Sequence, residues 1–342
     1  MRPIQRRGRA LLAWMRAFVC VLGCALGCVM AGPLQARELH GWSVHADDYP
    51  VNQGMQQFAQ AVGRISAGEH TARVHGNAQL APQGSVLGKL AQGEIDFAEI
   101  GVLGYGDRIP ALRVLGMPYL FQDSEQMFAL LDGELGRLLA AELRKYDVVL
   151  LGWYDGGTRN FYHRSKPLRR VSDFAGEKLR VAASSGHMQM VESLGGKPVP
   201  LPFKEVLGAL EKGQIDGAEN NLPSYESTGH YKLAPHYTLT RHLVSPEVLL
   251  MSRRTWEQFS PAAQLQLLEA GRLSAIHMRE QWNRRLLEIQ ARLEKQGVKF
   301  HAGGDAGPMV RRMRPLYEPL WASADPLSRQ ALGLVLRSMA GR

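Results

Sequence analysis

The feature that most constrains the fold is a twelve-residue pattern that occurs twice, 120 positions apart. Residues 88–99 and 208–219 share seven of their twelve residues in register, namely two glycines, a leucine and the residues Ile, Asp, Ala and Glu. Each copy combines the end of a predicted helix, a glycine that stops it and the start of a strand. The repeat predicts two similar lobes whose strand ends face each other across a ligand cleft. The alternative is that the similarity arose by chance, because such helix–glycine–strand junctions are common.

Strand-like and helix-like stretches alternate around both copies, which predicts an α/β sandwich with a mainly parallel sheet. In the first half we expect strands at 39–45, 71–75, 95–100 and 148–154, and helices at 51–65, 83–91 and 124–145. In the second half we expect strands at 160–163, 178–182 and 214–218, helices at 185–194 and 203–212, and an extended connector at 198–202.

The last hundred residues are expected to be largely helical from Pro246 onward. A serine followed by Pro261 opens a predicted helix that continues toward Gly297. A helix of about 35 residues would be about 50 Å long at 1.5 Å per residue, longer than one lobe. We therefore expect it to run across both lobes as a brace, and we expect a final helix at 308–339.

Residues 1–36 have the three parts of a secretory signal peptide: four arginines before residue 10, an apolar run at 11–32 and a small residue, Ala36, at the expected cut. An uncleaved membrane anchor and a lipoprotein are the alternatives. All three cysteines lie at positions 20–28, so the exported chain carries no disulfide and no cysteine metal ligand. We expect a periplasmic protein, stabilised by the large cores that a two-domain chain of this length can bury.

Charge and motifs exclude several function classes. Removing residues 1–36 takes away five of the 41 basic residues and none of the 32 acids, which leaves 36 − 32 = +4. This small excess is spread along the chain, so we expect no nucleic-acid partner. The sequence has no phosphate-binding loop, no zinc-protease motif, no serine-hydrolase elbow and no dinucleotide fingerprint, so we expect no cofactor and no enzyme. The histidines form no metal-binding spacing, although ligands that assemble in space stay possible.

One basic residue stands out within the second half. Arg180 lies on a predicted strand between apolar neighbours. Burying a guanidinium is costly unless it meets a carboxylate, and a two-pronged arginine–carboxylate pair holds an organic acid well in a dry cleft. The alternative is an internal salt bridge to one of the chain's own acids.

Several peptides together resemble the extracytoplasmic receptors of TRAP transporters, the DctP-type family. They are RNFYH at 159–163, DFAGEKLRV at 173–181, LGGKPVP at 194–200, FKEVLGAL at 203–210 and GQIDGAEN at 213–220, with weaker matches GEIDFA at 93–98 and LGMPYLF at 115–121. The resemblance is dense over 157–222 and covers most of the chain. It implies an α/β, two-lobed periplasmic binding protein fold with a ligand cleft between the lobes and a long helix bracing both.

The resemblance also implies a function: a receptor that closes like a hinge around a small organic acid and delivers it to membrane permease subunits. By resemblance Arg180 grips the ligand carboxylate, Arg159 supports it, Asn220 hydrogen-bonds the ligand and Phe203 lies against it. On the first-lobe side, which varies among members, we expect Tyr49 and Glu99.

Tyr225 is expected to add an aromatic wall to this pocket. The lobes are expected to comprise 37–157 with about 246–285, and 158–245 with about 286–342, in a protein that is monomeric. A secreted enzyme acting on small carboxylic acids and a receptor feeding a signalling partner are the rival functions.

Overall fold

The computed structural model describes residues 37–323 and 325–340. The expected signal peptide lies outside these residues. Within them no helix is both long enough and apolar enough to cross a bilayer. Nine strands occur in the described part, at β1 Arg37–Trp42, β2 His70–His75, β3 Phe97–Gly101, β4 Val148–His163, β5 Lys178–Val181, β6 Lys197–Pro200, β7 Gly217–Asn220, β8 His236–Ser252 and β9 Lys299–Ala302.

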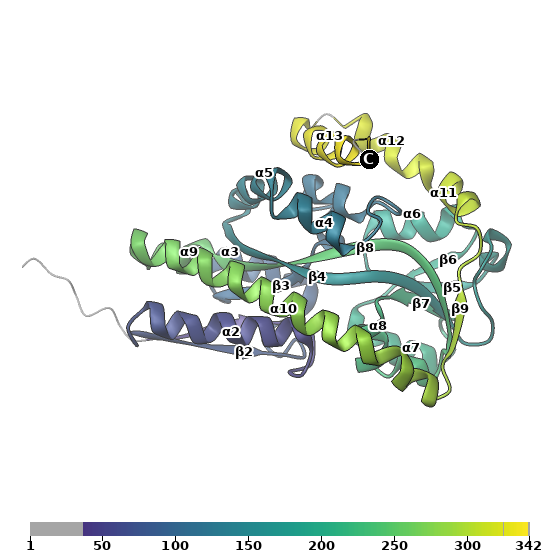
Figure 1. The fold of residues 1–342 in the computed structure, drawn as a ribbon, viewed down its shortest axis with the longest axis horizontal. Coiled ribbons are helices and arrows are strands. Elements are labelled where there is room, and N and C mark those ends of the chain that lie inside the picture. Colours follow the sequence, from purple (N-terminus) through teal and green to yellow (C-terminus); the bar gives the residue numbers. More distant parts are fainter. Residues whose placement is uncertain (1–36, 324, 341–342) are drawn as a thin grey trace, which may run out of the picture. The chain divides into compact units, whose positions relative to one another are not determined.

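The strands form one mixed sheet in the order β2-β1-β3-β8-β4-β7-β5-β6, with β9 paired to β8 (Figure 1). Pairs β1–β3, β5–β6, β5–β7 and β8–β9 are parallel. Pairs β3–β8, β4–β8 and β4–β7 are antiparallel. The expectation of a mainly parallel sheet is met in part: four of these seven pairs are parallel, whereas β4 runs antiparallel to both of its neighbours and β8 runs antiparallel to β3 and β4.

Strands β4 and β8 extend through the whole sheet and connect its two halves. The C-terminal end of β8 pairs with β3 and its N-terminal end with β9, while β4 pairs with β8 along its length and with β7 at its C-terminal end. We call the sheet around β2, β1 and β3 the first half, and the sheet around β7, β5, β6 and β9 the second half. The strands expected at 148–154 and 160–163 are one strand, whose register with β8 shifts between Asp155 and Thr158. Glycines lie at this irregularity, and Pro246 lies opposite Asp155. Glycine and proline are both unusual inside strands, so the sequence pattern did not indicate one continuous strand.

The stretch after Pro246 was wrongly expected to be helical from its start, since β8 continues to Ser252. Twelve α-helices lie in the described residues, namely α2 Pro50–Ile65, α3 Val86–Gln92, α4 Ser124–Leu131, α5 Glu134–Leu143, α6 Ser185–Ser193, α7 Val206–Glu211, α8 Leu222–Ser227, α9 Arg253–Trp256, α10 Pro261–Lys295, α11 Gly307–Met313, α12 Glu318–Trp321 and α13 Pro326–Ala340. The single helix expected at 124–145 is divided after α4, where Gly133 follows the helix cap.

The two copies of the repeated sequence pattern have the same structural role. Asp96 accepts a hydrogen bond from the backbone N–H of His40 at 2.7 Å, and Asp216 accepts one from the N–H of Lys178 at 2.8 Å. The N–H of each aspartate donates in return to the carbonyl of the same partner, at 3.0 and 2.8 Å. Each copy therefore joins a strand to its parallel neighbour, β3 to β1 and β7 to β5. This equivalence supports the interpretation of the repeat as two similar halves.

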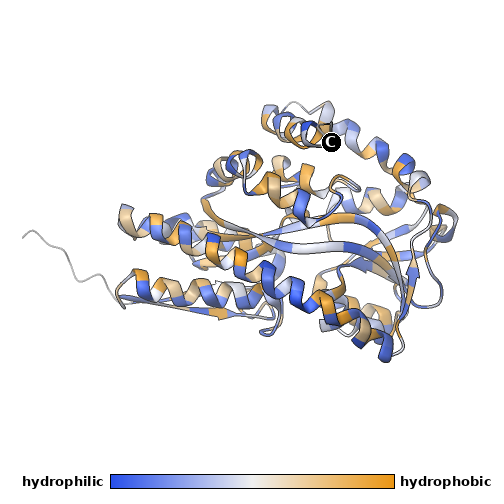
Figure 2. Ribbon diagram, viewed as in Figure 1, coloured by the Kyte–Doolittle hydropathy of each residue, from blue (hydrophilic) through white to orange (hydrophobic). Residues whose placement is uncertain are grey.

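Helix α10 is unbroken over 35 residues, as the sequence predicted. The hydroxyl of Ser260 caps it by accepting from the N–H of Ala263 at 3.2 Å, and Pro261 occupies its first turn. It packs on α2 and β4 and then on α8, so it contacts elements of both halves (Figure 1). Figure 2 shows polar and apolar residues interspersed along it, as expected for a helix with one buried face.

The C-terminal segment differs from the single helix expected at 308–339. It consists of α11, α12 and α13, with a 3₁₀ turn at Arg314–Tyr317 between the first two. Helix α13 packs on α5 and on the 3₁₀ helix Pro110–Gly116, in a hydrophobic core that belongs to the first half. Assigning this helix to the second lobe was therefore wrong, because its apolar face is covered by first-half side chains. The other lobe boundaries stay predictions.

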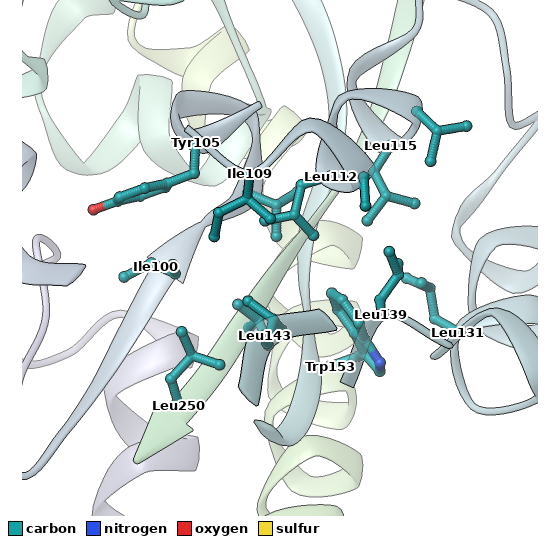
Figure 3. Packing of buried hydrophobic residues seen from close by; sticks show 14 of the residues in the cluster. Ile100, Tyr105, Ile109, Leu112, Leu115, Leu131, Leu139, Leu143, Trp153 and Leu250 are labelled. Atoms are coloured by element: carbon teal, nitrogen blue, oxygen red, sulfur yellow. The ribbon is translucent and has the colours of Figure 1, made fainter. Parts of the chain in front are cut away.

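The first-half core shows how the cavity wall described below is supported. Ile100 of β3 and Leu250 of β8 pack with apolar side chains from 109–115, α4 and α5 (Figure 3). Trp153 of β4 lies beside Leu131 and Leu139 in this cluster and is buried. Burial of such side chains contributes roughly 1.5–3 kcal/mol each, so this layer holds β3 and β8 in fixed positions.

Helix α10 approaches β4 closely enough to require glycine. A Cβ on Gly271 would lie 2.5 Å from the carbonyl oxygen of Leu151, whereas a Cβ on Gly208, in α7, would meet nothing within 4 Å. We expect Gly271→Ala to destabilise the protein by about 1–3 kcal/mol through overpacking. Gly208→Ala should stabilise it by up to about 1 kcal/mol, because alanine favours helix. Thermal unfolding of both variants measures the contrast, and a stabilised Gly271→Ala variant would contradict the close packing.

Candidate functional site

A cavity of about 90 Å³ lies where side chains of the two halves meet. The second half contributes Arg159, Arg180, Ala182, Phe203, Asn220, Asn221 and Ser224, and the first half contributes Val44, His45, Gln83, Glu99, Gly101, Leu103, Gly104, Ser245 and Glu247. Five of the seven residues expected at the ligand site are among them. The two expected residues that do not line the cavity are Tyr49 and Tyr225.

Arg180 is a buried cation without a carboxylate partner in the described part of the chain. It lies on β5, opposite Val199 of β6 and Ala218 of β7, and is 4% exposed. Its Nε and one terminal nitrogen donate to the carbonyl oxygen of Leu201 at 3.0 and 2.6 Å. Burial lowers the pKa of Arg180 to about 10, so the group stays charged at neutral pH. A positive charge held in this way favours an anionic guest.

Arg159 differs from Arg180 because its charge is already neutralised. Its Nε and Nη2 donate to the two carboxylate oxygens of Glu219 at 2.5 and 2.8 Å, a two-pronged pair. Glu219 is fully buried, and His242 Nε2 lies 3.5 Å from Glu219 Oε2, the oxygen that Arg159 Nε contacts. Burial alone would raise the pKa of Glu219, but Arg159 and His242 hold it far below its usual range. The pair fixes the guanidinium beside the cavity.

Asn220 and Phe203 line the same cavity. Asn220 ends β7, and its side-chain oxygen accepts from the N–H of Asn221 at 2.8 Å. This contact leaves its NH₂ group without an acceptor among the described residues, so it is free to donate into the cavity. The ring of half-buried Phe203 lies edge-on to His45, with centroids 6.0 Å apart, and forms an apolar surface. The location of both residues agrees with the sequence prediction, and their ligand contacts stay a prediction.

The first-half wall contains one predicted residue and two that the sequence reasoning missed. Glu99 of β3 lines the cavity, together with His45 and Glu247. Glu247 lies on β8 directly after Pro246, in the stretch that was taken for the start of a helical region. No motif marked His45. It is the last residue of the strand expected at 39–45, and strand ends that border a cleft are typical positions for binding residues, so this position could have been proposed.

The two carboxyl groups on this wall are close, buried and raised in pKa. Burial and the neighbouring Glu247 raise the pKa of Glu99 to about 8, and burial raises the pKa of Glu247 to about 8. His45 Nε2 lies 3.3 Å from Glu247 Oε1 and 3.9 Å from Glu99 Oε2. Burial lowers the pKa of His45, which is thus neutral at pH 7. The ligand atoms of the three side chains lie within 4.8 Å of one another, close enough to hold a cation.

The pKa values of this pair predict how stability depends on pH. The folded protein retains protons that unfolded glutamates, with a pKa of 4.5, release, so stability falls as pH rises toward about 8. His187 and His230, whose pKa values burial lowers to about 4 and 3, no longer titrate above pH 7.

We therefore expect the free energy of unfolding of the ligand-free protein to fall between pH 6.5 and 8, by about 1.4 kcal/mol per pH unit for each proton that only the folded state retains. The Tm should fall with it. Glu247→Gln should flatten this decline. Scanning calorimetry across the interval tests it, and an equal slope in the variant would contradict a shared titration.

The structure places Tyr49 and Tyr225 behind the cavity. Tyr49 is fully buried, stacks on His45 with centroids 4.1 Å apart, and shares a 2.8 Å hydrogen bond with Ser224. It supports the wall and joins α2 of the first half to α8 of the second.

Tyr225 was wrongly expected to form a pocket wall. It is fully buried, packs on Tyr162 and Tyr237 with centroids 4.8 Å apart, and donates its hydroxyl to the carbonyl of Ala234 at 2.7 Å. It is a core residue because its one polar atom already has an internal partner.

Comparison with known proteins decides the family. The family model described as bacterial extracellular solute-binding protein, family 7 (DctP) matches residues 42–324. This chain belongs to that family. A solute-binding protein of Chromohalobacter salexigens is 31% identical over 315 residues, covering 92% of this chain and 94% of the relative.

Two solved TRAP periplasmic solute-binding proteins are similar to this chain in fold and sequence. A TRAP periplasmic solute-binding protein from a Sulfitobacter species, with bound β-D-galacturonate, superposes with a TM-score of 0.84 at 35% identity, covering 88% of this chain and 99% of that protein. One from Roseobacter denitrificans, with bound β-D-glucuronate, has a TM-score of 0.84 at 35% identity, covering 87% and 98%.

Membership of family 7 confirms the resemblance and the two-lobed α/β fold inferred from the sequence. The chain is a TRAP-type solute-binding protein for a small organic acid. Members of this type are periplasmic receptors that work with membrane permease subunits. The buried cation in the cavity agrees with this assignment, since it can pair with the carboxylate of an acid.

Proposed function

We propose that this receptor captures a hexuronate, such as galacturonate or glucuronate, and delivers it to its permease chemically unaltered. One observation carries the proposal: Arg180 is buried in the cavity and has no carboxylate partner in the described part of the chain. A ligand carboxylate would supply the missing negative charge. The uronates bound by two relatives at 35% identity support the choice of acid.

The cavity residues suggest how a uronate would be held. Arg180 would bind the carboxylate, with Arg159 fixed beside it by Glu219. The free NH₂ of Asn220 would donate to a ligand oxygen. Phe203 would cover an apolar face of the sugar ring, whose C–H groups pack on aromatic surfaces.

Ligand affinity can be tested directly by thermal shift. At a concentration of about 100 times Kd, a ligand that binds only the folded state adds about 2.7 kcal/mol of stability. We expect D-galacturonate or D-glucuronate to raise the Tm by several degrees, and D-galactose, which lacks the carboxylate, to leave it unchanged. Mass spectrometry of the recovered ligand should show its mass unchanged. Equal shifts with galactose, or none with either uronate, would reject the proposal.

Closure of the two halves around the ligand has a candidate latch. Asp107, after β3, accepts hydrogen bonds from the N–H of Ser185 at 2.8 Å and from its hydroxyl, at the start of α6. Burial opposes the charge, but these bonds lower the pKa of Asp107. The latch would form only in the closed state, because it joins the two sides of the cleft.

We expect Asp107→Asn to weaken uronate binding about three- to tenfold, since a charge-assisted bond across the cleft becomes neutral. The matched control is Asp305→Asn, because Asp305 is exposed and, among the described residues, accepts only from the N–H of Gly307, two residues away, at 2.9 Å. Isothermal titration calorimetry measures both variants. Equal affinities for Asp107→Asn and the control would show that the contact between Asp107 and Ser185 does not stabilise the closed state.

Export and oligomeric state belong to the same proposal. We expect cleavage near Ala36, detectable as the intact mass of protein recovered from the periplasm. A cleaved receptor is expected to be a monomer, which light scattering measures. A retained N-terminus would instead favour the anchored alternative.

A further inference from the structure

The first-half wall of the cavity carries a polar cluster whose composition is unusual for a site that takes an anion. Glu99 on β3 and Glu247 on β8 lie on the same face of the sheet, because Gly101 pairs with Glu247 and Glu99 lies two residues along the same ladder. Glu99 is 1% exposed, Glu247 9% and His45 6%. In the described part of the chain no lysine or arginine lies within ion-pair distance of either carboxyl group.

The cluster has more hydrogen-bonding capacity than the protein uses. Glu99 Oε2 accepts from the hydroxyl of Ser43 at 3.2 Å, and Glu247 Oε1 is 3.3 Å from His45 Nε2. Glu247 Oε2 is buried and accepts from no N–H group or hydroxyl in the described part of the chain, although the carboxyl groups of Glu99 and Glu247 are close enough to share a proton. A buried polar atom left without a partner costs roughly 1–3 kcal/mol, so a ligand that supplies one gains that energy.

Hydroxyl groups are the ligand chemistry that fits. A hydroxyl both donates and accepts, so it can pair with a carboxylate oxygen, a protonated carboxyl group or a neutral histidine nitrogen. A second carboxylate would instead be buried beside a wall where, in the described part of the chain, no lysine or arginine lies within ion-pair distance, and an unpaired buried charge is costly. The raised pKa values of Glu99 and Glu247 show that this wall disfavours negative charge.

We propose that His45, Glu99 and Glu247 form a hydroxyl-binding subsite that selects hydroxylated monocarboxylates and rejects dicarboxylates. The cavity is then bipolar: Arg180 takes the single carboxylate, and the acidic wall takes the hydroxyl groups of the rest of the molecule. This inference rests on the proposed function and adds the residues that set its specificity. It explains why a receptor for an acid has two glutamates in its binding cavity.

The test compares D-galacturonate with galactarate, the corresponding dicarboxylate, by isothermal titration calorimetry. We expect the wild-type protein to bind galactarate at least 100-fold more weakly than galacturonate. Measured at pH 9, where both glutamates ionise, Glu247→Gln and Glu99→Gln, which keep the size of the side chain but remove its charge, should each narrow this affinity ratio at least tenfold. The matched control Glu257→Gln, in an exposed pair with Arg253, should leave the ratio unchanged.

Three results would overturn the subsite. An unchanged ratio in both cavity variants would show that the glutamates do not select against the second carboxylate. Loss of galacturonate binding in EDTA, restored by Ca²⁺ or Zn²⁺, would show that the three side chains hold a cation instead. If wild-type protein binds a dicarboxylate tightly and no uronate, both the subsite and the proposed ligand fail, whereas unchanged selectivity with intact uronate binding rejects the subsite alone.

Discussion

Arg180→Ala is expected to reduce uronate affinity at least 100-fold while leaving the ligand-free protein folded. Truncating one partner of a buried charge pair costs about 2–5 kcal/mol, and the ligand carboxylate would lose its only unpaired cation in the described part of the cavity. The ligand-free Tm should be unchanged or higher, because the variant no longer buries an unneutralised guanidinium. Calorimetry and thermal unfolding measure the two effects separately.

Two further variants make this result specific. Arg180→Lys keeps the charge but cannot make a two-pronged contact, so it should recover only part of the affinity. Arg253→Ala removes an exposed arginine, whose partners are Asp147 and Glu257, and should change neither affinity nor fold. Full affinity in Arg180→Ala would remove Arg180 from the site and, with it, the main physical support for a bound acid.

The sequence was sufficient to predict the second-half side of the site because the resemblance to the DctP-type receptors is dense over 157–222. Arg180 is flanked by apolar residues on β5, and Asn220 directly follows the repeated pattern at the end of β7. Glu99 was expected from the same resemblance, and it is the last residue of the first copy of the repeated pattern. Sequence alone did not decide which arginine was already paired, because that depends on Glu219 lying beside Arg159 across the β4–β7 ladder.

The first-half side was only partly predictable, since it depends on a strand that the sequence disguises. Pro246 and the register shift opposite it interrupt the pattern of β8, so Glu247 was not expected on the cavity wall. Tyr225 failed for a different reason: an aromatic residue beside a predicted site packs equally well into a core. Only the tertiary contact of its hydroxyl with Ala234 distinguishes the two.

The largest loss of stability is expected from Glu219→Gln. Glu219 is fully buried and neutralises Arg159, so the variant leaves a guanidinium buried without its counter-charge. Breaking a buried pair in this way costs about 3–5 kcal/mol, enough to lower the Tm by several degrees or more. The control is Glu257→Gln, whose pair with Arg253 at 2.8 Å is exposed and should contribute less than about 1 kcal/mol.

The pH dependence provides an independent check on this assignment. Because the folded-state pKa of Glu219 lies far below the unfolded value of 4.5, its contribution is complete above that value and declines as pH falls below it. The difference in Tm between wild type and Glu219→Gln should therefore be largest near neutral pH and shrink in acid. Adding Arg159→Met to Glu219→Gln should recover part of the stability, since no unpaired charge stays buried. A double variant no more stable than Glu219→Gln, or a Tm difference independent of pH, would mean that the pair does not stabilise the fold through its charges.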